Sequence, residues 1–206
     1  INTAEHFGLS REMGMIAPGR YADILILRDL VEFKINSVFA KGQLAAQDGK
    51  TLIDPPKFTY PDWATNSFHL AHPLSEKDFV IKAPNKDYVT ANVIGVIENQ
   101  APTKHLKMQV PVYQNEIQPD LVQDIIKISV VERHKGTGRV QTGLVHGFGF
   151  KTACAVASTV AHDSHHMIVA GTNDSDMALA VNQLAKIRGG QIVVKEGKVI
   201  GQVALP

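Results

Sequence analysis

Histidine side chains offer the most informative chemistry in this sequence. Nine occur, and the densest group is the run Ala161-His162-Asp163-Ser164-His165-His166. Three imidazoles and a carboxylate this close together could hold a transition metal, and they could also relay protons near neutral pH. Strand-like apolar runs flank the group, so we expect a turn, in which spacing alone does not fix the ring directions. Three interpretations follow: direct chemistry by His162, Asp163 and His165, orientation of other groups within a site, or a structural polar turn.

A second candidate is a charged run after a predicted strand. It reads Glu132-Arg133-His134-Lys135-Gly136-Thr137-Gly138-Arg139, and its two glycines let another group approach the backbone closely. The functional interpretation is a loop in which Glu132, Arg133 and His134 line a substrate site. The alternative is a solvated hairpin turn.

The sequence does not support a phosphate-binding loop, a serine nucleophile or a reactive cysteine. Residues 143–149 contain three glycines but not the Gly-Lys-Ser/Thr of a phosphate-binding loop. Ser158 and Ser164 lack the Gly-x-Ser-x-Gly elbow of a serine nucleophile. Cys154 lies in an apolar run that disfavours a reactive thiol, and a single cysteine cannot form an internal disulfide. A reduced, cytoplasmic setting is therefore expected.

The composition is that of a soluble globular protein and argues against two classes of partner. Of 206 residues, 44% are hydrophobic and 20% charged, with a net charge of +1. A nucleic-acid-binding module would usually carry a basic stripe, which this balance does not provide. No apolar run approaches the roughly 18 residues that a membrane span needs. We therefore expect neither a nucleic acid nor a membrane as partner.

The elements that position these side chains fall into three regions: 1–53, 54–86 and 87–206. The first is predicted to be a small β piece after a short helix over 2–9. Its strands are expected at 22–27, 33–40 and 43–46, with turns at Lys41-Gly42 and Asp48-Gly49.

The region 54–86 is predicted to be an irregular connector, because it holds five of the ten prolines. It also holds several aromatic rings, which would contribute no hydrophobic stabilisation if they were exposed to solvent. We therefore expect the connector to lie across a surface and bury Phe58, Tyr60, Trp63, Phe68 and Phe79.

The third region is predicted to be a regular mixed α/β domain. One helix begins near Asp174 with Asn173 as its cap, and Gly189-Gly190 marks its end. Strands are expected at 89–97, 106–112, 126–132, 141–145, 153–160, 167–170, 191–194 and 199–203.

Residues 14–27 resemble the segment that closes enzymes of the amidohydrolase superfamily. They read Gly14-Met15-Ile16-Ala17-Pro18-Gly19-Arg20-Tyr21-Ala22-Asp23-Ile24-Leu25-Ile26-Leu27. There the chain leaves the last helix of a metal-binding barrel and returns to a small β-sandwich. The resemblance implies that region 1–53 is the end of such a barrel and part of that sandwich.

A narrower resemblance covers the rest of the chain. Four runs are similar to the C-terminal domain of bacterial adenine deaminases: Val131-Glu132-Arg133-His134, Gly147-Phe148-Gly149-Phe150-Lys151, Ser158-Thr159-Val160-Ala161-His162-Asp163-Ser164-His165 and Gly171-Thr172-Asn173-Asp174-Ser175-Asp176-Met177. The chain departs from that family at position 166, where it has His and the family usually has Asn.

The resemblance implies a parent hydrolase that converts adenine and water to hypoxanthine and ammonia, with a binuclear Mn²⁺ or Fe²⁺ centre. The superfamily's metal ligands include a His-x-His pair, and none occurs in these 206 residues. We therefore expect an α+β fold in which a β-sandwich remnant precedes a mixed α/β C-terminal domain and the TIM-like barrel is missing. No metal ligand is expected in this chain, and adenine, the missing N-terminal barrel and further copies of the chain are the expected partners.

Two alternatives stay open. One is an independent metal-binding module that uses His162, Asp163, His165 and His134. The other is a structural or oligomerisation domain of another amidohydrolase.

Overall fold

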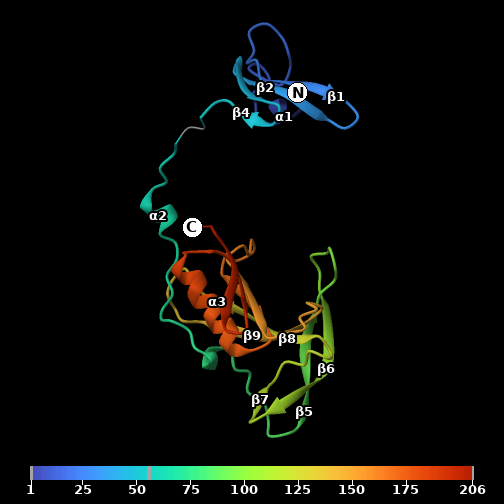
Figure 1. Cartoon of the computed structure of the whole chain (residues 1–206), viewed down its shortest axis with the longest axis vertical. Helices are drawn as coiled ribbons and strands as arrows, with labels where there is room; N and C mark the ends of the chain where they lie inside the picture. The colour runs from blue at the N-terminus through green and yellow to red at the C-terminus, as the bar shows by residue number, and fades with distance from the viewer. Residues whose placement is uncertain (1, 55–56, 206) are drawn as a thin grey trace. The chain divides into compact units, whose positions relative to one another are not determined.

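A computed structural model describes residues 2–54 and 57–205, and the chain divides into two units (Figure 1). The first unit ends at Thr59 and the second begins at Tyr60. This division falls inside the predicted connector, so its residues from Tyr60 onward belong to the second unit. Pro55 and Pro56 of the connector lie outside the described residues, as do Ile1 and Pro206.

The first unit is a short helix and one four-stranded antiparallel sheet. Its elements are α1 (Asn2–His6), β1 (Ile24–Asp29), β2 (Lys34–Ala40), β3 (Gln43–Gln47) and β4 (Lys50–Thr51), and the strands pair in chain order. β2 and β3 form the predicted hairpin because Lys41 and Gly42 both adopt positive φ, which matches the twist of the strands. The helix is shorter than predicted and is followed by Gly8 at φ +71°.

The second unit is built on a nine-stranded sheet. Its strands are β5 (Tyr88–Gly95), β6 (Lys104–Tyr113), β7 (Glu116–Ile117), β8 (Ile125–Val131), β9 (Val140–His146), β10 (Cys154–Ser158), β11 (Met167–Gly171), β12 (Gly190–Lys195) and β13 (Lys198–Ala204). They lie in the order β13-β12-β10-β11-β8-β9-β5-β6-β7, and only β5 and β9 pair in parallel. The eight predicted strands of this region are confirmed within two residues at each end. β7 was missed because two residues carry no readable alternation.

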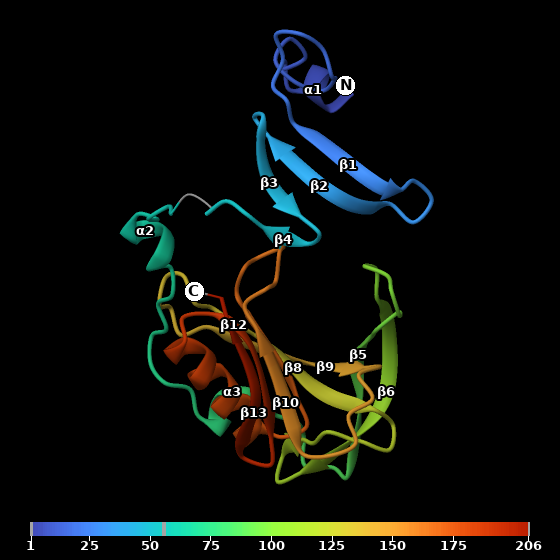
Figure 2. The same cartoon turned by 45° about the horizontal axis from the view of Figure 1, so that its top comes forward.

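One face of the part of this sheet formed by β10, β11 and β12 is covered by α3 (Asp174–Lys186), as Figure 2 shows. The Asn173 side chain accepts a hydrogen bond from the Asp176 N–H at 2.7 Å, so the predicted cap is confirmed. The apolar face of α3 and the strands below it form the largest core cluster, which includes Met177, Val181, Leu184, Val169 and Ile192. None of the helices in the described ranges has the length and apolarity needed to cross a membrane.

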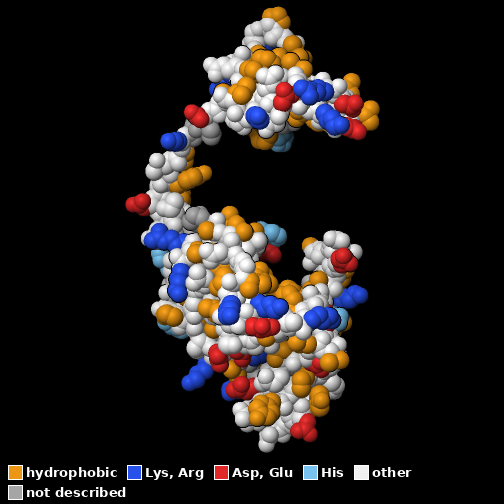
Figure 3. Space-filling view, viewed as in Figure 1, with side chains coloured by type: hydrophobic (Ala, Val, Ile, Leu, Met, Phe, Trp, Pro, Cys, Tyr) orange, Lys and Arg blue, Asp and Glu red, His pale blue; other side chains and the backbone are white. Residues whose placement is uncertain are grey.

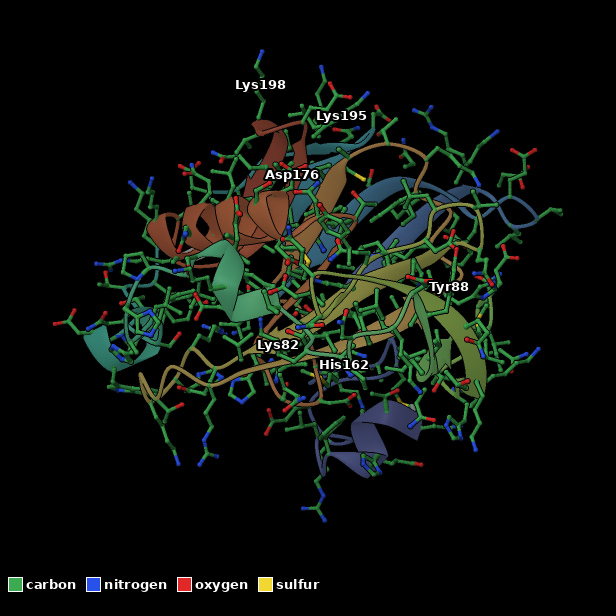
Figure 4. The ribbon with its side chains drawn as sticks, turned by 90° about the horizontal axis from the view of Figure 1, so that it is seen from below. Lys82, Tyr88, His162, Asp176, Lys195 and Lys198 are labelled. Atoms are coloured by element: carbon green, nitrogen blue, oxygen red, sulfur yellow. The ribbon has the colours of Figure 1, made fainter. Side chains whose placement is uncertain are left out.

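Two polar contacts fix the start of α3 over the sheet. Lys127 of β8, only 2% exposed, donates to both carboxylate oxygens of Asp174 at 2.6 and 2.7 Å. Asp176 is also buried and accepts from the Gly197 N–H in the β12–β13 turn. Figure 4 shows Asp176 on α3 near the strands that carry Lys195 and Lys198.

The connector is only partly packed, and one expectation about it is wrong. Phe79, at the end of the 3-10 helix η1 (Glu76–Phe79), is fully buried, and Phe68 packs against the same core. Phe58, Tyr60 and Trp63 are instead 71%, 64% and 81% exposed, with Trp63 in the short helix α2 (Asp62–Thr65). The connector reaches α3 at Leu74, whose backbone exchanges two hydrogen bonds with the Asn182 side chain. Further along, Ile81 and Ala83 pack against a second core cluster.

The α+β prediction is confirmed: one sheet layer is followed by a mixed α/β unit, and the described residues contain no parallel barrel.

Candidate functional site

The run from Glu132 to Arg139, which we call the arginine loop, is organised around one carboxylate. Glu132 accepts the N–H groups of His134, Lys135 and Thr137 at 2.6 to 2.9 Å, and also the Thr137 hydroxyl. Desolvation acts to raise the pKa of Glu132, but the combined hydrogen bonds outweigh it and lower the pKa to about 2. The carboxylate therefore stays ionised and shapes the loop.

Arg133 extends from this loop to two other segments. Its Nε–H donates to the backbone carbonyl of His165 at 2.7 Å, and its Cζ lies 5.4 Å from the centroid of the Phe68 ring. The Arg133 carbonyl accepts the His69 N–H at 2.6 Å. Burial lowers the pKa of the Arg133 guanidinium. Arg133 thus joins the arginine loop, the connector and the loop after β10.

Residues 161–166, which we call the histidine loop, form a tight turn between β10 and β11. The N–H groups of Ser164 and His165 both point to the Ala161 carbonyl, at 3.2 and 2.6 Å, and His165 has φ +53°. The predicted turn is therefore confirmed. His162 and Asp163 lie at its tip, with side chains 91% and 97% exposed and Nδ1 3.4 Å from Oδ1. The tip is solvent-facing, whereas the base is held by Arg133.

His166, the last residue of the histidine loop, lies beside His134 of the arginine loop. Its ring centroid is 5.0 Å from that of His134, with the planes tilted by 43°. Its Nδ1 is buried and has no hydrogen-bond partner in the described part of the chain. A cavity of about 320 Å³ adjoins this ring and is lined by Val130, Glu132, Arg139, Val140, Gln141 and His166.

The structure thus brings together some of the predicted residues and separates others. Arg133 and His134 meet the base of the histidine loop, while His162 and Asp163 extend away from it. Glu132 lines the cavity, although its oxygens are occupied by the arginine loop itself. Figure 3 shows histidine side chains, in pale blue, at several separate places on the second unit.

The connector also contributes to the site, and the sequence alone did not predict this. His69 reaches the site through its backbone, and a Cβ added at Gly138 would lie 3.4 Å from His72 Nε2. The only available signal was that a Pro-rich segment also carried two histidines beside Phe68. Nothing in that signal says which loop the segment would meet.

The glycine-rich segment 147–149 also has a structural explanation. The Asp124 carboxylate accepts the N–H groups of Gly147 and Gly149 at 3.1 and 2.8 Å. These donors are therefore already used within the chain and do not form a phosphate cradle.

The donor set does not fit a metal centre. Among residues 2–54 and 57–205, no three His, Cys, Asp or Glu side chains lie where they could share a metal ion. The independent metal-binding module is therefore not supported by the side chains of this chain.

Comparisons with known proteins show what this chain is similar to. The family model for the adenine deaminase C-terminal domain matches residues 100–206, and the amidohydrolase family model matches residues 1–45. Among curated proteins, adenine deaminases from Ruegeria pomeroyi and Moorella thermoacetica are 49% and 47% identical to this chain, and adenine deaminase 3 of Rhizobium meliloti is 48% identical. Each match covers 100% of this chain but only 34–35% of the relative, so the chain spans about a third of their length. The chain belongs to the family of adenine deaminase C-terminal domains.

Proposed function

We propose that this chain is the C-terminal part of an enzyme that hydrolyses adenine to hypoxanthine and ammonia. The proposal is supported by three relatives that are named adenine deaminases and are 47–49% identical over the whole chain. The amidohydrolase match at residues 1–45 supports a metal-dependent hydrolase with its metal-bearing barrel in another part of the protein. The proposed metal is Mn²⁺ or Fe²⁺, held outside this chain.

The role that we assign to the second unit is to close the active site of that enzyme. The observation that carries it is the contrast within the histidine loop: the base is clasped by Arg133, and the tip presents His162 and Asp163 to the outside. A fixed base limits the conformational entropy lost when the tip contacts another surface. Imidazoles at such a tip can enclose substrate or relay a proton near neutral pH.

The first test asks whether this chain is sufficient for catalysis. Purified 206-residue chain is mixed with adenine and Mn²⁺, and hypoxanthine is measured. We expect no turnover, because the chain offers no fitting metal ligands within its described residues. Sustained conversion of adenine would contradict the proposal that the metal centre lies in another part of the protein.

The second test uses a full-length enzyme that contains this segment. His162→Ala and His165→Ala should each lower kcat at least about tenfold, the effect of losing roughly 1.4 kcal/mol of transition-state stabilisation. His105→Ala, on the outer strand β6, is the matched control and should retain activity. Wild-type kcat in both loop variants would end the idea that the histidine loop serves the reaction.

Two further features of the whole protein are part of the proposal. The single cysteine, which cannot form an internal disulfide, supports a cytoplasmic enzyme. Assembly into a homo-oligomer rests on the family resemblance alone, and light scattering of the full-length protein tests it.

A further inference from the structure

Arg133 is a partly buried cation whose orientation is fixed. One edge of its guanidinium is held by the His165 carbonyl through Nε, and its Cζ lies over the Phe68 ring. The backbone of Arg133 is held in turn by the His69 N–H. Two segments far apart in sequence, the connector and the histidine loop, therefore set the orientation of one guanidinium. Such preorganisation reduces the entropy cost of a further contact.

The charge of Arg133 has no carboxylate partner within the described ranges. Ion pairs there involve Arg28, Lys34, Lys82, Lys127 and His162, each with its own acid. Glu132, the adjacent acid, directs both oxygens to backbone N–H groups of its own loop. A cation that loses hydration without gaining a counter-charge is costly, and burial accordingly lowers the pKa of Arg133.

The unused donors define the chemistry of a ligand. A guanidinium has five N–H groups in a planar fork, and only the Nε–H of Arg133 has a hydrogen-bond acceptor in the described residues. The four N–H groups on the two Nη atoms match an anion with two oxygens in one plane. The arginine loop adds Lys135 and Arg139 to Arg133 and only Glu132 as an acid, so the local field favours an anion.

We propose that Arg133 is the centre of an oxyanion-binding site, in which its Nη groups take a carboxylate or a phosphate in a forked pair of hydrogen bonds. The site does not depend on the deaminase assignment, since it rests on the orientation and missing counter-charge of one side chain. The ligand can be a small acid or an acidic group of a partner, and both present the same oxygens.

Side-chain NMR of the whole chain tests the site. The Arg Nε–H signals are followed while sodium acetate or sodium phosphate is added, with sodium chloride at equal ionic strength as reference. We expect a saturable shift of the Arg133 signal with a Kd in the millimolar range, as for a few charge-assisted hydrogen bonds in water. Saturation by acetate alone identifies a carboxylate site, and saturation by phosphate alone identifies a phosphate site.

Variants separate this site from general charge attraction. Arg133→Gln should abolish the saturable effect on the neighbouring His165 and His166 amide signals, whereas Lys198→Gln, at an exposed cation on β13 outside both loops, should leave the saturable shift unchanged. Arg133→Lys keeps the charge but lacks the fork and should weaken binding at least about fivefold, with folding checked from the amide spectrum. Shifts that rise linearly with salt, or that persist in Arg133→Gln, would overturn the proposal.

Discussion

The two units of this chain use the same antiparallel hairpins but differ in what covers their sheets. In the second unit, α3 and the connector cover one face, and fully buried side chains such as Phe79 and Leu184 fill the space between. In the first unit, only Ala4, Ser37 and Ala45 are buried among the described residues. Figure 3 shows hydrophobic side chains, in orange, on the surface of that unit.

The difference shows that strand pairing alone does not make a core. A sheet is stabilised when a second layer removes its apolar face from water. Leu25, Ile26 and Ile35 of the first unit remain 43–49% exposed, so hydrophobic burial contributes little there. We infer that the second unit carries the stability of the chain and that the first depends on contacts with another layer.

The largest expected effect comes from truncating the core of the second unit. Phe79→Ala should lower the free energy of unfolding by about 3–5 kcal/mol, because it removes a fully buried ring and leaves a cavity. Leu25→Ala in β1 is the matched change in the first unit and should cost less than about 1 kcal/mol. Urea unfolding followed by circular dichroism measures both, and equal losses would break the comparison.

The next largest loss of stability is expected at the ion pair between Lys127 and Asp174, beneath α3. Asp174→Ala should cost about 3 kcal/mol, since it leaves the Lys127 ammonium buried without its partner. Adding Lys127→Met should recover much of that loss, because the uncompensated charge is removed as well. Thermal unfolding of the single and double variants provides the measurement, and a double variant that is no better than Asp174→Ala would refute the argument.

Acid sensitivity tests the arginine loop. The folded pKa of Glu132 is lowered to about 2 from 4.5, so its contribution to stability is fully present above pH 4.5 and is lost as the pH falls toward 2. The Glu132→Gln variant should be less stable by about 1 kcal/mol at pH 7. Its free energy of unfolding should also fall less than that of the unmodified chain as the pH is lowered toward 2. Unfolding curves from pH 7 to pH 2 measure it, with Glu98→Gln as the control at an exposed site.

The smallest effect is expected at the tip of the histidine loop. His162→Ala and Asp163→Ala should change stability by less than about 0.5 kcal/mol, because both side chains are more than nine-tenths exposed. Arg133→Ala, at the base, should cost more, since it removes the bond to His165 and the contact with Phe68. A tip variant as damaging as the base variant would show that the tip is structural.

Local signals predicted most of the fold. β11 is an unbroken apolar run and β8 is a mostly apolar one, while α3 has its cap at Asn173 and its glycines after the end. The types of these elements could therefore be predicted from residues that are close in sequence. The connector rings could not be assigned in this way. Phe79 is buried, Phe68 is partly buried and Trp63 is exposed, because burial depends on whether the core lies opposite each ring.

The candidate site likewise combines features that the sequence predicted with features that only the folded chain shows. Sequence information was enough to predict the turn at 161–166, the charged loop at 132–139 and the family resemblance, because spacing, turn chemistry and motif identity are local properties. The folded chain was needed to show that Arg133 clasps His165, that His166 rather than His162 lies beside His134, and that the connector brings Phe68. Those contacts join residues that are far apart in sequence, and they exist because β8 and β11 pair side by side and the connector crosses the end of that pair.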